Sequence, residues 1–95
     1  MSVSAVIGKE MAYKDYDYGR RWRQVRLDIS GLSVGANTIP HGLKTTSQGS
    51  VTIMRENVLL TSVMACHQSS PGDATNLYYT VDSGPGTTMS VWVVV

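Results

Sequence analysis

The fold is decided by one alternating stretch of the sequence, Arg23-Gln24-Val25-Arg26-Leu27-Asp28-Ile29. Its apolar residues recur at every second position, which is the period of a β-strand with one buried and one solvated face. Further segments rich in Val, Ile, Thr and Tyr follow, separated by clusters of Gly, Pro, Asn and Ser. Five or six short strands of this kind predict an all-β fold, a small antiparallel β-sandwich of jelly-roll-like or Ig-like type.

The strands expected after residue 29 are Asn37–Leu43, Val51–Arg55, Val58–Gln68, Asn76–Val81 and Thr87–Val95. Pro40 lacks a backbone N–H, so the first of these should lie at a sheet edge or leave the sheet there. Asn57 should end the second, and the continuous apolar character of the third predicts a strand covered on both faces. The expected core is Val25, Leu27, Ile29, Leu32, Ile39, Leu43, Val51, Ile53, Leu59, Val63, Ala65, Leu77, Tyr79, Val81, Val91 and Val93.

Charge divides the chain unevenly. Ten of its fifteen charged residues lie between Lys9 and Asp28, and only five lie in the 67 residues from Ile29 to Val95. This division predicts an extended N-terminal arm over residues 1–22 and a β-sandwich domain over residues 23–95. A domain of this size buries only about 60 to 65% of its unfolded surface. Cys66 is the only cysteine, so oligomerisation or docking on a larger body is the expected source of added stability.

Composition argues against several kinds of partner. The net charge is +1 and the isoelectric point is near 7.9, whereas nucleic-acid-binding domains usually exceed about 9. No stretch approaches the roughly 20 apolar residues that a membrane span requires, and the first residues lack the basic and apolar regions of a secretory signal. We therefore expect no nucleic acid and no membrane as partner, and synthesis in a cytoplasm.

Few residues offer catalytic or metal chemistry. Cys66 and His67 are neighbours in an expected strand, so their side chains should point to opposite faces. With His41 they make three N or S ligands without zinc spacing, so we expect a small buried Cys66 and turn or surface histidines. Asp73 lies in a turn signal, where Asp bonds to the backbone. The sequence thus predicts no enzyme, no metal site and no cofactor.

A cluster of arginine and aromatic residues suggests a docking element. Guanidinium groups form bidentate pairs with carboxylates, and Trp, Tyr and Arg are enriched at binding hot spots. The alternatives are an ordinary strand with a solvated face, contact with nucleic acid, and tyrosines that lie back on their own domain. The candidate partner-binding residues are Tyr13, Tyr16, Tyr18, Arg20, Arg21, Trp22, Arg23 and Arg26.

The remainder of the chain carries unusually little charge. Five charges in 67 residues are about 7%, while a freely soluble small domain presents a surface with roughly 25 to 35% charged residues. The segment Val91–Val95 is apolar on both faces, and as an uncovered edge it would aggregate. We therefore expect much of the exterior to be covered by copies of the chain or by a scaffold.

Two phrases carry a resemblance to a known group of proteins. They are the run Ile29-Ser30-Gly31-Leu32-Ser33-Val34-Gly35-Ala36-Asn37-Thr38-Ile39-Pro40-His41-Gly42-Leu43 and the closing Ser90-Val91-Trp92-Val93-Val94. With the Thr- and Val-rich strands between them, they resemble small β-sandwich virion proteins of tailed bacteriophages, found in capsid decoration (cement) proteins, head fibres and tail fibres. The resemblance covers roughly residues 28–95 and carries over no catalytic residue.

The resemblance and the residue pattern together lead to one hypothesis and one alternative. The hypothesis is a non-enzymatic capsid decoration protein, a homotrimer on the capsid surface of the virion, whose partner is the major capsid protein. Its residues 9–26 would span a seam between coat subunits. The alternative is a receptor- or glycan-binding tip of a head or tail fibre, with the loops Thr45–Gly49 and Gln68–Thr75 as contact surface.

Overall fold

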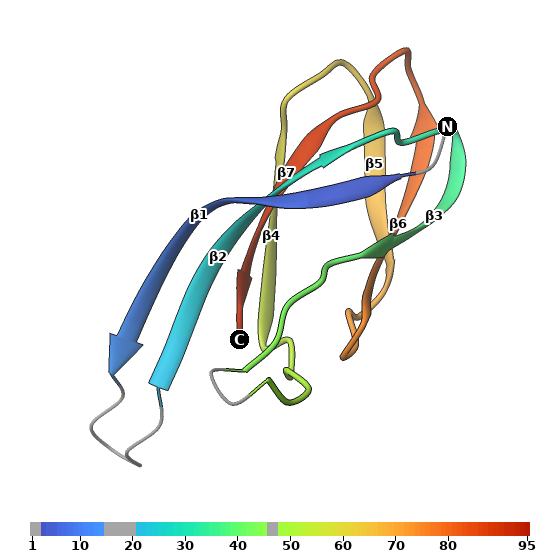
Figure 1. The fold of residues 1–95 in the computed structure, drawn as a ribbon. Helices are drawn as coiled ribbons and strands as arrows, with labels where there is room; N and C mark the ends of the chain where they lie inside the picture. Colours follow the sequence, from blue (N-terminus) through green and yellow to red (C-terminus); the bar gives the residue numbers. More distant parts are fainter. Residues whose placement is uncertain (1–2, 15–20, 46–47) are drawn as a thin grey trace.

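The computed structural model describes residues 3–14, 21–45 and 48–95, with the backbone alone at residues 12–14 and 21–22. Seven strands and no helix form in these residues: β1 (Ser4–Lys14), β2 (Arg21–Ser30), β3 (Gly35–Pro40), β4 (Arg55–Leu60), β5 (Ala65–Ser70), β6 (Asn76–Ser83) and β7 (Met89–Val94). They pair antiparallel into sheet A, of order β1-β2-β7-β4, and sheet B, of order β3-β6-β5. The two sheets form a small sandwich (Figure 1), so the predicted fold class is confirmed.

The division into four and three strands is that of a constant-type immunoglobulin domain, but the strand order differs. That domain has its first, second, fifth and fourth strands in one sheet and its third, sixth and seventh in the other. Here β7 occupies the place of the fifth strand, and β5 lies beside β6 in sheet B. The last strand is therefore central in its sheet, between β2 and β4.

Alternating apolar residues of four strands build the core. From β2 the inward residues are Val25, Leu27 and Ile29, and β6 and β7 contribute alternate residues in the same way. The polar residues between them face out of the sandwich because successive side chains in a strand point to opposite faces. The buried apolar residues are Val25, Leu27, Ile29, Leu32, Ile39, Leu43, Val51, Met64, Leu77, Tyr79, Val81, Met89, Val91 and Val93.

The expected strands at both ends of the domain are confirmed as β2, β6 and β7. β3 lies at an edge of sheet B and ends at Pro40, as the missing N–H of that residue requires. β7 is paired along both edges by β2 and β4. Both edges of β7 are thus covered from within the chain, whereas Trp92 and Val94 on its outer face remain partly exposed.

The middle of the chain differs from the sequence prediction. β4 begins at Arg55, and Asn57, expected to end a strand, lies within it. The segment expected as one covered strand over residues 58–68 divides at residues 61–64 into the end of β4 and the start of β5, in different sheets. Leu59, Val63 and Ala65 are exposed, whereas Met64 and Met89 join the core. A continuous apolar run looks the same whether it is buried or exposed at an edge.

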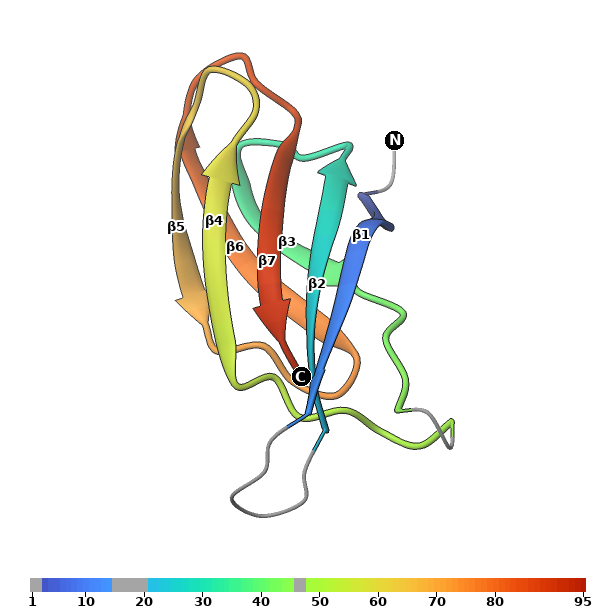
Figure 2. The same cartoon turned by 90° about the vertical axis from the view of Figure 1, so that its left-hand side faces the viewer.

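The N-terminal segment is largely sheet. Residues 4–14 of the expected arm form β1, which pairs with β2 in a ribbon that extends away from the sandwich (Figures 1 and 2). The boundary expected between residues 22 and 23 falls inside β2. A register shift between Ile7 and Lys9 places a bulge at Gly8, and such an insertion hides the period of two in the sequence.

The ribbon continues beyond the rest of sheet A. Arg23 and Val95 exchange backbone hydrogen bonds of 3.0 and 2.9 Å, and this pair marks the end of the contact between β2 and the C-terminal segment. Beyond it, Trp22 and Arg21 pair across the ribbon with Tyr13 and Lys14 of β1. Among the described residues, this part of the ribbon consists of β1 and β2 alone.

Candidate functional site

Five of the eight predicted docking residues lie on strands β1 and β2 of the ribbon. Tyr16, Tyr18 and Arg20 lie outside the described residues, and the structure gives Tyr13, Arg21 and Trp22 by their backbone alone. The β1–β2 register places Tyr13 directly opposite Trp22. Arg23 and Arg26 are described in full. The predicted surface is therefore defined here by its strand register and by these two arginines.

Arg23 lies at the base of the projecting ribbon. It occupies the same face of β2 as the core residue Val25, and its Nη1 donates to Oε1 of Glu10 on β1 at 2.9 Å. Its Nη2 donates to the backbone carbonyl of Lys44, in the loop after β3. Arg23 thus joins both strands of the ribbon to the loop between β3 and β4.

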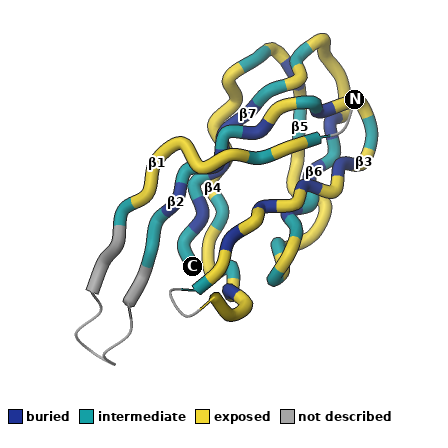
Figure 3. The backbone as a smooth tube through the Cα atoms, in the orientation of Figure 1, coloured by how far each residue is buried: buried dark blue, intermediate teal, exposed yellow. Residues whose placement is uncertain are grey.

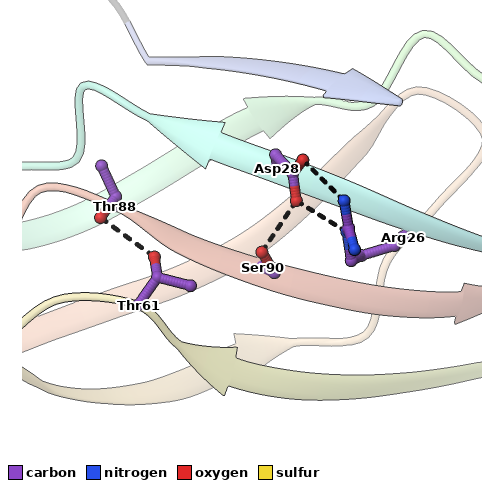
Figure 4. A network of polar contacts seen from close by, with 5 residues as sticks. All are labelled: Arg26, Asp28, Thr61, Thr88 and Ser90. Carbon is purple, nitrogen blue, oxygen red and sulfur yellow. Dashed lines mark hydrogen bonds and ion pairs between the residues drawn. The ribbon is translucent and has the colours of Figure 1, made fainter. Parts of the chain in front are cut away.

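Arg26 lies on the opposite face of sheet A, because it is three positions along the strand from Arg23 and successive side chains alternate. Its Nε and Nη2 donate to the two carboxylate oxygens of Asp28, at 3.0 and 3.3 Å. The hydroxyl of Ser90 on β7 donates to Asp28 Oδ1 at 2.9 Å (Figure 4). The hydrogen bond from Ser90, followed by that from Arg26, lowers the pKa of Asp28 below its ordinary value. This network keeps Asp28 ionised and ties β2 to β7.

A shallow, open hollow of about 550 Å³ lies over this network on the outer face of sheet A. Thr61, at the end of β4, donates a hydrogen bond of 3.0 Å to Thr88, and both line the same hollow (Figure 4). Val6 of β1 and Leu59 of β4 form apolar walls on either side. The hollow presents a paired charge and hydroxyls between apolar side chains, an arrangement suited to a polar contact surface.

Sequence reasoning missed an apolar surface at the far edge of sheet A. Exposed residues follow one another along β4 and into the loop beyond it (Figure 3). The sequence contains them in the run that was expected to be buried, and only the strand order reveals that this run is an edge. They are Val58, Leu59, Leu60 and Val63.

The residues considered for nucleophilic or metal chemistry lie in three separate places. The Cys66 thiol is partly buried near Sδ of Met89, at 3.9 Å, and burial raises its pKa, with a further contribution from Asp82. His67 points outward, as predicted, and its Nδ1 lies 2.8 Å from Asp82. Among the described residues, no group of His, Cys, Asp or Glu side chains is placed to hold a metal ion.

His41 differs from its expected turn or surface position. It is buried in the loop after β3, where its Nδ1 accepts a hydrogen bond from the backbone N–H of Leu43 at 3.0 Å. Its Nε2 lies 2.8 Å from the carbonyl oxygen of Asp73 and donates to it. The Nδ1 bond holds the ring within the β3–β4 loop, and the Nε2 bond joins this loop to the β5–β6 loop. Both ring nitrogens are thus engaged, which assigns the residue a structural role.

Asp73 organises the β5–β6 turn, as the sequence predicts. Its Oδ1 accepts hydrogen bonds from the backbone N–H groups of Thr75 and Asn76, at 2.9 and 2.7 Å. The Tyr78 hydroxyl donates to its other oxygen. The bond from Tyr78, followed by those from the backbone, holds the pKa of Asp73 well below its ordinary value. The carboxylate is fully engaged within its own turn.

No described helix is long and apolar enough to cross a membrane. Comparison of the chain with protein-family models, with curated proteins and with solved structures finds no match.

Proposed function

We propose that this chain is a non-enzymatic structural protein that attaches to a larger protein body through the β1–β2 ribbon. The observation that carries the proposal is the continuation of the ribbon beyond the Arg23–Val95 pair, where the described residues of β1 and β2 pair with each other and with no other described strand. An isolated two-stranded ribbon is only marginally stable in water. A partner surface that covers it would provide the packing that the sandwich does not.

The chemistry of the ribbon suits docking on protein. Tyr13 and Trp22 occupy directly opposed positions, and opposed aromatic residues supply a compact apolar anchor. Arg20 and Arg21 bring guanidinium groups for carboxylates of the partner. Arg23 and Arg26 already pair with Glu10 and Asp28, so we assign them to the support of the ribbon and to its rim.

We further propose that the partner is the major capsid protein of a tailed bacteriophage and that the chain decorates the outside of the virion. The support is the sequence resemblance of residues 28–95 to virion β-sandwiches, together with a body that carries little charge. Many copies on one particle would add weak individual contacts into stable attachment through multivalency.

The test is a variant with a shortened ribbon. Replacement of residues 14–21 by Asn-Gly closes the hairpin on the Tyr13–Trp22 pair, since a two-residue type I′ turn favours this dipeptide. It removes Tyr16, Tyr18, Arg20 and Arg21. The unmodified chain should sediment with undecorated phage heads, and the folded variant should bind at least ten-fold more weakly.

Two controls define the outcome of this experiment. Trp22→Ala in the full-length chain should weaken binding, whereas Val34→Ala, at an exposed position outside the ribbon, should not. Undiminished binding by the shortened variant would place the interface on the sandwich and refute docking through the ribbon. Absence of binding by the unmodified chain would refute the capsid as partner.

A second candidate function is binding of a receptor or glycan at a fibre tip, which the hollow on sheet A favours. Its paired charge, Thr61 and Thr88 offer hydrogen-bonding groups that a sugar can use. Binding of the purified chain to host cells, lost on Asp28→Ala and retained by the shortened ribbon, would support this candidate over the capsid.

A further inference from the structure

The outer edge of β4 combines apolar side chains with an unpaired strand edge. Val58, Leu59 and Leu60 expose 43%, 56% and 45% of their surface, and Val63 in the following loop exposes 77%. β4 is the last strand of sheet A, and in the described part of the chain β7 is its only strand neighbour. An exposed apolar edge of this kind is a template for pairing with a further strand.

The backbone groups along this edge can be assigned from the sheet register. Arg23 and Val95 exchange both of their hydrogen bonds, and in an antiparallel ladder such pairs alternate with pairs that exchange none. The alternation across β7 directs the backbone groups of Arg55, Asn57 and Leu59 toward β7. The N–H and C=O groups of Val58 and Leu60 therefore point to the open edge.

The edge is complementary to itself in one register. Two antiparallel copies of β4 centred on Leu59 place Val58 opposite Leu60 of the second copy as a hydrogen-bonded pair, and Leu59 opposite its own equivalent. In this register Asn57 lies opposite Thr61 of the second copy, so that a polar residue pairs with a polar residue. A centre on Asn57 would place the Glu56 carboxylate opposite Val58, and a centre on Val58 would place it opposite Leu60. Only the centre on Leu59 pairs all three apolar residues of the strand, Val58, Leu59 and Leu60, with apolar residues.

Size and charge agree with a second copy as the occupant. The four exposed residues present on the order of 400 Å² per copy, divided between the two faces of the β4 edge, and apolar surface of a few hundred Å² is the scale that marks interaction sites. With backbone and rim included, two copies approach the roughly 1,200 Å² of small stable interfaces. The net charge of +1 opposes such pairing only weakly.

We propose that two copies of this chain associate through β4, antiparallel and about a two-fold axis at Leu59, so that sheet A continues across the dimer. This surface lies at the opposite edge of the sheet from β1, so the pairing is independent of docking through the ribbon. It replaces the trimer expected from the sequence with a closed two-fold pair.

Disulfide cross-linking tests the register. Leu59→Cys in a Cys66→Ser background places two thiols directly opposite at a pair without hydrogen bonds, where Cβ atoms approach to about 4.5 Å, within reach of a disulfide. Under mild oxidation this variant should form covalent dimers at least ten-fold faster than Val34→Cys in the same background, whose site is 65% exposed. Equal rates would overturn the proposal.

Sedimentation equilibrium tests the association without a cross-link. The unmodified chain should form a concentration-dependent dimer, and Leu59→Lys should weaken it at least ten-fold because two like charges then meet at the axis. Val34→Lys should leave it unchanged. A monomer at all concentrations up to about 0.5 mM would place the dissociation constant at about a millimolar or weaker and would overturn the two-fold pairing. A trimer would also overturn it. Because Leu59→Lys weakens the dimer and leaves the ribbon unchanged, the affinity of this variant for capsids measures docking through the ribbon without the contribution of pairing.

Discussion

At the scale of single residues, one carboxylate joins the two sheets. Glu56 of β4 accepts hydrogen bonds from the Tyr79 hydroxyl on β6 at 2.9 Å, from Gln68 Nε2 on β5 at 2.6 Å and from the backbone N–H of Gly72 at 2.9 Å. These bonds cross from sheet A to sheet B at the side of the sandwich where β4 and β5 are exposed. Burial, followed by the bond to Glu56, raises the pKa of Tyr79 far above its ordinary value.

Tyr79→Phe should therefore lower the free energy of unfolding by about 1.5 to 3 kcal/mol at pH 7, the range for a hydrogen bond to a charged group. Tyr78→Phe on the same strand also removes a hydrogen bond to a carboxylate, that of Asp73. Because that bond is exposed to solvent, which weakens charged contacts, its loss should cost less. Chemical denaturation of both variants and the unmodified chain measures the difference. A Tyr79→Phe variant as stable as Tyr78→Phe would deny Glu56 its role in joining the sheets.

The same tyrosine sets a dependence on alkaline pH. Its folded pKa lies above the unfolded value of about 10, so its contribution to stability is complete below pH 10 and is lost as pH rises above that value. Unfolding releases the proton, and each pH unit above 10 favours the unfolded state by about 1.4 kcal/mol. The stability advantage of the unmodified chain over Tyr79→Phe should shrink between pH 9 and pH 11.

At the scale of strands and turns, the sequence predicted those elements whose local pattern matches their environment. β2 alternates because one of its faces is buried and the other solvated, and β6 and β7 follow strong turn signals. The prediction for β4 was wrong because its apolar run lies at an exposed edge. The strand β1 was not predicted because the bulge at Gly8 breaks its period of two. Of the candidate site, the sequence located the aromatic and arginine cluster. It could not predict the contacts that depend on the fold. Arg23 binds Glu10 of β1 and the carbonyl of Lys44, and Ser90 of β7 completes the pair of Arg26 with Asp28.

Two glycines with the same backbone conformation separate the effect of backbone strain from that of packing. Gly84, in the β6–β7 turn, has φ of 110° and Gly35, at the start of β3, has φ of 108°. A Cβ at Gly84 would lie 2.6 Å from Cα of Met64 and 2.8 Å from the carbonyl oxygen of Val63, whereas one at Gly35 would meet nothing within 4 Å. The β6–β7 turn therefore contacts the β4–β5 turn, which contains Val63 and Met64, at Gly84.

Gly35→Ala should cost about 1 to 2 kcal/mol, the price of a non-glycine residue in a left-handed conformation. Gly84→Ala should cost at least about 1 kcal/mol more, because backbone atoms must move to relieve overpacking. Thermal and urea unfolding of the pair measure the difference. Equal losses of unfolding free energy in the two variants would mean that the β4–β5 turn shifts to accommodate the added methyl group at no measurable cost.

At the scale of the whole molecule, the N-terminal segment serves both the sandwich and the ribbon. Val3 and Ala5 pack against the core, and Ala5 lies opposite Ile29 of β2. Residues 12–14 of β1 and 21–22 of β2, in contrast, lie where the ribbon leaves the sandwich behind. If the segment were a single charged arm on an independent domain, every truncation of it would leave the free energy of unfolding equally unaffected. In this arrangement, truncation of the part that packs on the sandwich and truncation of the projecting part should affect that free energy differently.

Deletion of residues 1–11 should destabilise the molecule, by at least about 2 kcal/mol, because it uncovers part of the core and leaves β2 as an unpaired edge. The shortened ribbon with Asn-Gly in place of residues 14–21 keeps every contact of Val3 and Ala5 and should unfold within about 1 kcal/mol of the unmodified chain, since surface changes rarely exceed this. Urea denaturation at low protein concentration keeps β4 pairing out of the comparison. A deletion variant as stable as the full chain would show that β1 contributes nothing to the sandwich, and the segment would then be an arm in the sense that its charge pattern first suggests.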